Sequence, residues 1–135
     1  MERRRDIAKE IARTYCPMTP LGIETLSSIL VPMKFQKGET ILEVGKVCSA
    51  LFYVDKGMVR QYYYKNKKDV TEHFSYEGCI VICLESTLKQ EPTHLLAEAI
   101  EDCVLYYLPY QALLEAAEKS WEINIFYRKI LEYSL

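Results

Sequence analysis

The sequence predicts a mainly β fold with flanking helices, built as an antiparallel β-roll of the jelly-roll kind. Short apolar runs fill the middle of the 135-residue chain, and glycines separate them, as at Gly45 and Gly57. Glycine accepts the positive φ that tight turns demand. No helix-length segment interrupts these runs, and a parallel sheet would need one for each crossover connection. The pattern therefore predicts antiparallel strands that close into a roll.

The composition is that of one folded, soluble domain. Half of the residues are hydrophobic, which excludes a disordered chain. The formal net charge is −2, which argues against a nucleic-acid-binding surface on this segment. The longest apolar runs are too short for a transmembrane helix, and the basic N-terminus lacks the apolar run of a signal peptide. Five widely spread cysteines favour reduced thiols in the cytoplasm.

Residues 1–32 are expected to form two N-terminal helices. The first covers 5–15, because Ile7, Ala8 and Ile11 fall on one face and charges fill the other. The pair Thr19-Pro20 is a helix-start signal, with Thr as the N-cap and Pro at the first helical position. This second helix is expected to end near residue 30, before Pro32.

The β-roll is expected over residues 33–108. Its strands are predicted at 41–44, 51–54, 58–64, 70–74, 80–84, 95–100 and 103–108. A polar hairpin turn is expected at 65–69, a turn at 76–78 and a polar loop at 88–92.

Residues 109–135 are expected to be helical again, with a break near Ser120. The last helix, from Trp121, carries apolar residues at the 3-4-3 spacing of a coiled-coil seam. Such a stripe would be exposed on a monomer, so a homodimer is expected through this helix. The predicted interface residues are Ile123, Phe126, Tyr127, Ile130 and Tyr133.

A longer pattern resembles a known family. Phe35-x-x-Gly38-x-x-Ile41-x-x-x-Gly45, followed by Leu51-Phe-Tyr-Val54-x-x-Gly57-x-Val59, resembles the cyclic-nucleotide-binding fold of CRP/FNR-type bacterial transcription regulators. The resemblance continues to about residue 131. It implies a cytoplasmic, homodimeric sensor domain that responds to a small-molecule effector. It also implies that DNA is bound only by a helix-turn-helix domain beyond Leu135, and that no membrane is involved.

The family's ligand segment reads Gly-x-x-x-Gly-Glu, with Arg-Ser or Arg-Thr about ten residues later. Here Gly78 matches the first Gly, but Ile82 and Cys83 replace the Gly and Glu. The Arg position falls on Thr93, followed by His94. Binding of cAMP or cGMP is therefore expected to be weak or absent, since the groups for phosphate and ribose are missing. The candidate pocket residues are Gly78, Ile80, Val81, Ile82, Cys83, Leu84, Glu85, Thr93 and His94.

Two alternatives remain open, and an enzyme is not expected. Cys79 and Cys83 could serve a redox or metal sensor, although metal sites usually show tighter cysteine spacing. The chain could also be a β-roll that only dimerises, with Ile80, Val81 and Ile82 as core. A metal-dependent cupin enzyme would need several converging histidines, and only His73 and His94 are present.

Overall fold

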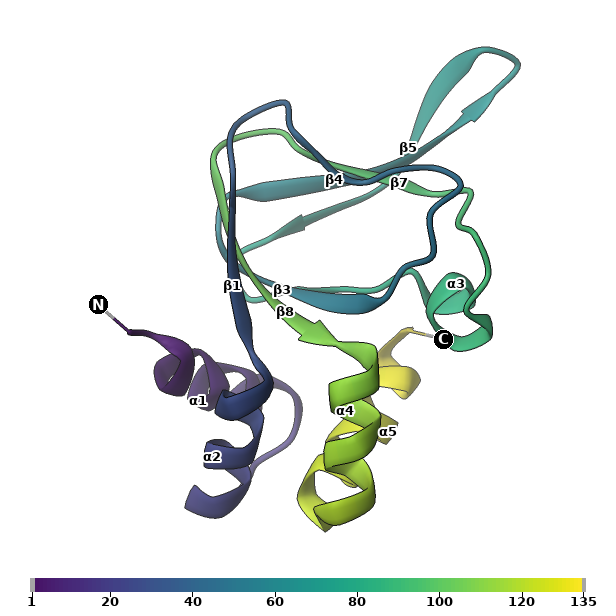
Figure 1. Ribbon diagram of the computed structural model, residues 1–135. Helices are drawn as coiled ribbons and strands as arrows, with labels where there is room; N and C mark the ends of the chain where they lie inside the picture. The colour runs from purple at the N-terminus through teal and green to yellow at the C-terminus, as the bar shows by residue number, and fades with distance from the viewer. Residues whose placement is uncertain (1, 135) are drawn as a thin grey trace.

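The computed structural model describes residues 2–134 and shows a β-roll standing on a group of helices (Figure 1). Four short elements differ from expectation, namely the strands Val31–Phe35, Thr40–Leu42 and Ile80–Val81 and the helix Leu84–Lys89, but the order of helices, roll and helices is as predicted. The elements are α1 (Arg4–Tyr15), α2 (Pro20–Ile29), β1 (Val31–Phe35), β2 (Thr40–Leu42), β3 (Ala50–Lys56), β4 (Met58–Lys65), β5 (Lys68–Tyr76), β6 (Ile80–Val81), α3 (Leu84–Lys89), β7 (Leu96–Ala99), β8 (Cys103–Pro109), α4 (Tyr110–Lys119) and α5 (Trp121–Ser134).

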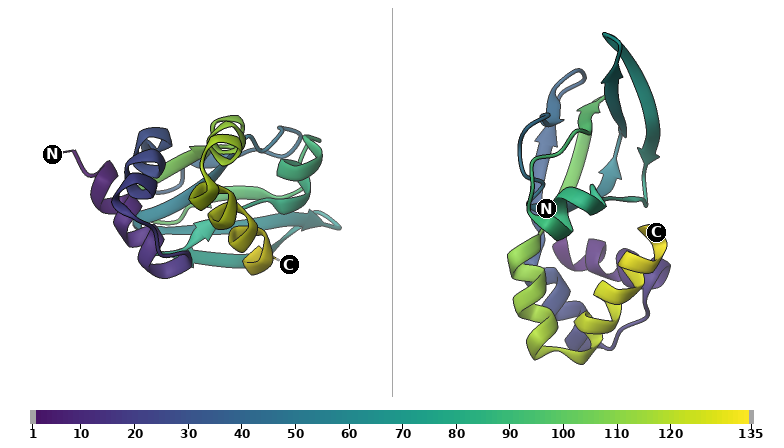
Figure 2. Two further views of the ribbon diagram at one scale, coloured as in Figure 1. Left: turned by 90° about the horizontal axis from the view of Figure 1, so that it is seen from below. Right: turned by 90° about the vertical axis from the view of Figure 1, so that its right-hand side faces the viewer.

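Two four-stranded sheets form the roll. Their strand orders are β1-β8-β3-β6 and β2-β7-β4-β5. Every strand ladder within residues 2–134 is antiparallel, which confirms the predicted fold class. The far ends of β4 and β5 form a hairpin that projects beyond the rest of the roll (Figures 1 and 2).

Strand β3 connects two hydrophobic cores because it is buried on both faces. Phe52 and Val54 point between the two sheets, into a core that also holds Leu105. Leu51 and Tyr53 alternate with them and contact the helices. Side chains of successive strand residues point to opposite faces, so this one run of apolar residues serves both cores.

The helices pack together under the first sheet, and Figure 2 shows α1, α2, α4 and α5 gathered at one end of the molecule. Thr19 caps α2 as predicted, since its hydroxyl accepts a hydrogen bond from the Gly22 N–H. Glu122 at the start of α5 accepts from both the Thr19 N–H and the Thr19 hydroxyl, each at 2.7 Å. This contact joins the beginnings of α2 and α5.

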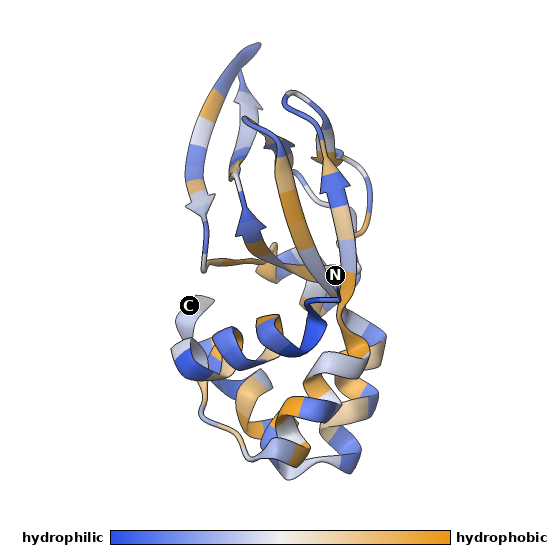
Figure 3. Cartoon of the chain, turned by 90° about the vertical axis from the view of Figure 1, so that its left-hand side faces the viewer, coloured by the Kyte–Doolittle hydropathy of each residue, from blue (hydrophilic) through white to orange (hydrophobic). Residues whose placement is uncertain are grey.

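Hydropathy along the ribbon follows this arrangement. In Figure 3 the hydrophobic stretches lie along the strands of the roll and where the helices face one another. The tip of the β4–β5 hairpin and the outer turns of the helices are hydrophilic. Within residues 2–134, no helix combines the length and the apolar character that a membrane crossing requires.

The expected exposure of the α5 stripe is wrong for most of its residues. Ile123 and Phe126 are fully buried and Ile130 is 2% exposed, all in the core that α5 shares with the other helices. The Tyr127 hydroxyl lies 2.7 Å from that of Tyr110. Only Tyr133 is exposed. The helices of one chain thus provide the apolar contacts that were expected from a second copy, and a dimer interface stays a prediction.

Three local expectations are also corrected. The predicted strand at 80–84 is only two residues long, and α3 begins at Leu84 and replaces part of the predicted loop at 88–92. Val44 lies outside β2 and is exposed. The hairpin turn is tight, with Asn66 and Lys67 at positive φ, so pairing extends from Lys65 to Lys68.

Candidate functional site

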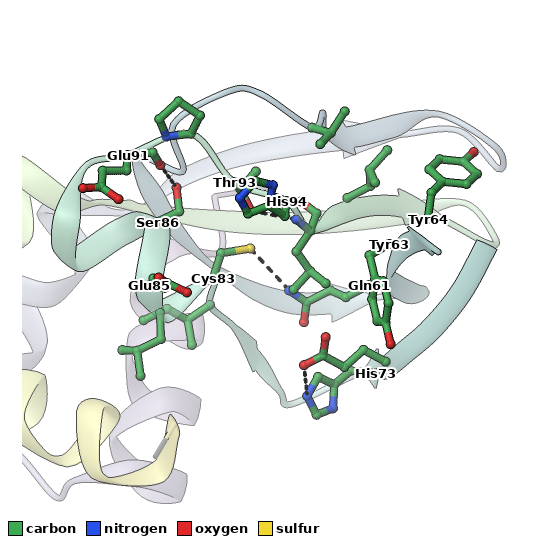
Figure 4. Close-up of a pocket in the computed structure, with 17 residues that line it drawn as sticks. Gln61, Tyr63, Tyr64, His73, Cys83, Glu85, Ser86, Glu91, Thr93 and His94 are labelled. Atoms are coloured by element: carbon green, nitrogen blue, oxygen red, sulfur yellow. Dashed lines mark hydrogen bonds and ion pairs between the residues drawn. The ribbon is translucent and has the colours of Figure 1, made fainter. Parts of the chain in front are cut away.

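A cavity of about 690 Å³ lies beside α3, under the β4–β5 hairpin. Side chains from β4 and β5 form one side, and the segment 82–86 forms the floor (Figure 4). The loop 91–95 closes the remaining side. The lining residues are Val44, Gln61, Tyr63, Tyr64, Glu72, His73, Ile82, Cys83, Leu84, Glu85, Ser86, Glu91, Pro92, Thr93, His94, Leu95 and Leu96.

The structure brings six of the nine predicted pocket residues to this cavity. They are Ile82, Cys83, Leu84, Glu85, Thr93 and His94. The other three lie elsewhere. Gly78 forms a turn with a φ of +93°, Val81 is buried between the sheets, and Ile80 packs toward the helical core. Core packing, the alternative for Ile80, Val81 and Ile82, is what the structure shows for all three, and Ile82 lines the cavity as well.

The sequence did not single out the residues that β4 and β5 contribute. Gln61, Tyr63, Glu72 and His73 reach the cavity because β4 and β5 pair beside it, with Gln61 opposite His73. A signal existed in Gln61, an uncharged polar residue between Arg60 and three tyrosines on the predicted strand 58–64. It is 4% exposed, and a buried amide at such a position indicates either a structural hydrogen bond or a ligand contact.

Buried polar groups hold the cavity walls in place. The Gln61 side-chain amide donates to Cys83 Sγ at 3.4 Å. The Ser86 hydroxyl donates to the Glu91 carbonyl oxygen at 2.6 Å and accepts from the Cys48 N–H at 2.9 Å. The Thr93 hydroxyl accepts from the Leu95 N–H at 2.9 Å and contacts the Leu95 carbonyl oxygen at 3.2 Å. These bonds order the loop 91–95 and join it to α3 through Ser86.

The ionisable groups around the cavity are carboxylates and imidazoles. Glu72, Glu85 and Glu91 line it together with His73 and His94, and none of its lining residues, all within the described chain, is Lys or Arg. Glu85 is paired with Lys89 at 3.2 Å on the exposed side of α3. His73 lies 3.7 Å from Glu72. The cavity thus offers hydrogen-bond acceptors and weak donors, but no fixed cation.

Arg60, which is next to the cavity residue Gln61 in the sequence, forms ion pairs with residues that do not line the cavity. Arg60 precedes Gln61 on β4 but forms an ion pair with Glu98 at 2.7 Å and another with Asp69 at 3.3 Å. Its guanidinium also stacks on the Tyr62 ring, 3.9 Å from the ring centre. Ion pairing raises the pKa of Arg60 against the opposing effect of its burial. Arg60 is therefore held on the other face of its sheet.

Cys79 and Cys83, the two cysteines considered for a redox or metal sensor, line different cavities. Cys83 lines the large cavity, whereas Cys79 lines a smaller one with Tyr15 and Tyr133. Cys48 is 1% exposed, and its thiol donates to the Ala50 carbonyl oxygen at 3.3 Å. The nearby Cys83 thiol lowers the pKa of Cys48, and the same neighbour, with burial, raises the pKa of Cys83. Among the described residues, no three His, Cys, Asp or Glu side chains form a metal-binding group.

Comparison with known proteins identifies the family. The sequence profile of the cyclic nucleotide-binding domain matches residues 32–120. The catabolite activator protein of Thermus thermophilus superposes with a TM-score of 0.77 at 18% identity, over 93% of this chain and 57% of that one. The sensor domain of the transcriptional regulator DNR from Pseudomonas aeruginosa gives 0.77 at 15% identity, over 100% and 92%.

A third similar structure is the regulatory domain of Toxoplasma gondii PKA with cAMP, at a TM-score of 0.74 and 14% identity, over 97% of this chain and 51% of that one. The chain thus spans little more than half of the Thermus and Toxoplasma chains. At these identities the three structures establish the fold alone. A search of curated protein sequences found no match.

Proposed function

The chain belongs to the cyclic nucleotide-binding domain family, and from that premise we propose that it is the sensor and dimerisation domain of a CRP/FNR-type transcription regulator. Its fold is that of regulatory domains, and the similarity to the DNR sensor domain covers the whole chain. We assign it no catalytic role. Its DNA contacts would be made by a separate domain, because the net charge of −2 gives this one no basic surface to attract nucleic acid.

The proposed cavity is a degenerate cyclic-nucleotide pocket with a changed effector class. The observation that carries this proposal is its charge, three carboxylates and two imidazoles without an ammonium or guanidinium group. A buried cyclic phosphate needs a cationic partner, because an unpaired buried charge is costly. Each missing charge-assisted hydrogen bond costs roughly 1.5–3 kcal/mol. The absence of the two family groups replaced by Cys83 and Thr93 therefore weakens cAMP binding by roughly a hundredfold or more.

The same surroundings favour an uncharged or cationic effector with an aromatic or amide-like edge. Tyr63 and Tyr64 provide ring faces, and the buried Gln61 amide provides a donor and an acceptor within the cavity. Aromatic faces attract cations as well as flat neutral rings. A neutral nucleoside or nucleobase, or an aromatic amine, has the size and polarity that this wall would recognise.

Thermal unfolding with added ligand tests the proposal. The purified chain is melted with cAMP, cGMP, adenosine and an aromatic amine, each near about 1 mM. A ligand at about 100 times its Kd adds roughly 2.7 kcal/mol of stability, which raises Tm by several degrees in a domain of this size. The cyclic nucleotides are expected to leave Tm unchanged. A shift of several degrees with cAMP would disprove the degenerate pocket.

A further inference from the structure

A second cavity, of about 480 Å³, lies between the two sheets, where β2 faces β3 and β8. Phe52 and Tyr107 form its floor, and their ring centres are 4.6 Å apart. Within residues 2–134, no residue lines both this cavity and the one beside α3. Its volume is in the range of small-molecule sites, and the effector site proposed above makes no use of it.

An irregularity in β2 shapes one wall of this second cavity. The pairing of β2 with β7 shifts between Thr40 and Leu42, so Ile41 is an extra residue of the kind that forms a β-bulge. Neighbouring side chains on a regular strand point to opposite faces. Here Ile41 and Leu42 both pack against the core inside the roll, and both line the cavity. The irregularity thus gives this wall two adjacent apolar side chains.

Backbone hydrogen bonds order another wall, which the connection from β2 to β3 provides. The Gly45 N–H donates to the Thr93 carbonyl oxygen, and the Thr93 N–H donates to the Lys46 carbonyl oxygen, both at 2.9 Å. Glu43 and Lys46 are the only charged residues among those that line the cavity in the described chain, and both are exposed. Because their charges have opposite signs, this wall is ordered but favours no ion of either sign.

The floor of the second cavity carries one unused polar group. The Tyr107 hydroxyl has no hydrogen-bond partner within residues 2–134, although the ring beneath it packs against the core of the roll. Burial raises the pKa of Tyr107 to about 12, so the hydroxyl keeps its proton and is able to donate a hydrogen bond. A molecule that matches this cavity is therefore neutral and mainly apolar, and it carries a hydrogen-bond acceptor.

We propose that this cavity is a second small-molecule site, which takes a neutral aromatic compound with a carbonyl oxygen as the acceptor. The ring of the ligand packs on Phe52 and Tyr107, in the tilted or offset arrangements that aromatic rings prefer. Its carbonyl oxygen accepts a hydrogen bond from the Tyr107 hydroxyl. The two cavities have separate linings, so this site stands whether or not the cavity beside α3 binds an effector.

An NMR titration of the intact chain, labelled with ¹⁵N, tests where such a compound binds. The probe is acetophenone, an aromatic ketone, added up to its solubility limit. Saturable shifts are expected for the backbone amides of residues 40–43, 46–52 and 107, which surround the second cavity. The amides of Gln61 and Tyr63 report on the cavity beside α3 in the same spectra. No shift around the second cavity, or shifts confined to the cavity beside α3, would overturn the proposal.

Tyr107→Phe isolates the hydrogen bond, because it keeps the ring beside Phe52 and removes only the hydroxyl. A circular dichroism melt checks that the variant is folded. Its affinity for acetophenone should fall roughly 2- to 10-fold. Ethylbenzene has nearly the same shape but no acceptor, so it should bind the native chain and the variant equally. Tyr63→Phe is the matched control, and it should change neither affinity. Unchanged acetophenone affinity in Tyr107→Phe, or an equal loss in Tyr63→Phe, would contradict the proposal.

Discussion

Thr93 bears directly on whether the proposed cavity can bind an anionic effector. It occupies the position where the resemblance places an arginine, and it is 5% exposed. Its hydroxyl is used within its own loop, by both polar groups of the Leu95 backbone. The side chain therefore stabilises the loop and leaves no donor for an anionic ligand.

Replacing Thr93 by Arg should recover affinity for cAMP. A guanidinium at this position would add one charge-assisted hydrogen bond of roughly 1.5–3 kcal/mol, which corresponds to roughly a 10- to 100-fold lower Kd. Thr93→Met is the matched control, since it adds comparable bulk without charge and also removes the hydroxyl. Isothermal titration with cAMP measures both variants. Equal affinities for Arg and Met would contradict the argument that a missing cation excludes the phosphate.

Among the elements, the turn between β3 and β4 is the most sterically constrained. Gly57 has a φ of +95°, and an added Cβ would lie 2.5 Å from the Asp102 carbonyl oxygen and 2.6 Å from Cys103 Sγ. Gly38 has a similar φ of +90°, but no atom within 4 Å of that point. Both glycines have a positive φ, but only at Gly57 would an added Cβ meet neighbouring atoms.

Gly57→Ala should therefore destabilise the fold far more than Gly38→Ala. Positive φ alone costs roughly 1–3 kcal/mol for alanine, and Gly57→Ala adds a clash with backbone atoms that cannot move aside as a flexible side chain could. We expect Gly38→Ala to lower Tm by several degrees and Gly57→Ala by about 10 °C or more. Thermal unfolding followed by circular dichroism measures both. Equal losses would mean that the Asp102–Cys103 segment shifts freely.

The elements that could be predicted are those whose sequence signals act over only a few residues. The Thr19-Pro20 start of α2 and the antiparallel roll were correct because caps, glycine turns and apolar runs act within a few residues. Helix α3 was missed because the apolar run at 80–84 is equally compatible with a buried strand, and only tertiary packing ends β6 at Val81.

The candidate site was predictable only in part, for a related reason. Ile82 and Thr93 could be placed by alignment with a family motif. Gln61 and His73 enter the cavity through the register between β4 and β5, which a single sequence does not specify. The sequence alone likewise does not show that Cys79 and Cys83 line different cavities, because this depends on where β6 ends and α3 begins.

At the scale of the whole molecule, the roll and the helices are one unit through β3 and β8. Leu51 and Leu108 are fully buried against the helices, while Val54 and Leu105 on the same strands are fully buried inside the roll. Two strands therefore link the core inside the roll with the core among the helices.

If α5 forms the predicted dimer contact, it must do so through its outer face, since its inner face is part of the core. Ile130→Glu would bury an unpaired carboxylate beside Phe126 and unfold the chain, so that variant cannot report on assembly. Trp121 is 72% exposed, and it lies two residues from Ile123, on the opposite side of the helix. Arg128 is exposed on the same side. Exposed Trp and Arg are typical of interface centres.

Trp121→Glu should therefore shift the sedimentation profile of the chain from dimer toward monomer while leaving its melting temperature nearly unchanged. The matched control is Phe74→Glu, because Phe74 on β5 is 54% exposed and also aromatic but lies on the roll. Analytical ultracentrifugation over a concentration series, with circular dichroism to check the fold, compares the two with the native chain. A native chain that stays monomeric at high concentration, or equal effects of both substitutions, would exclude α5 as the dimer contact.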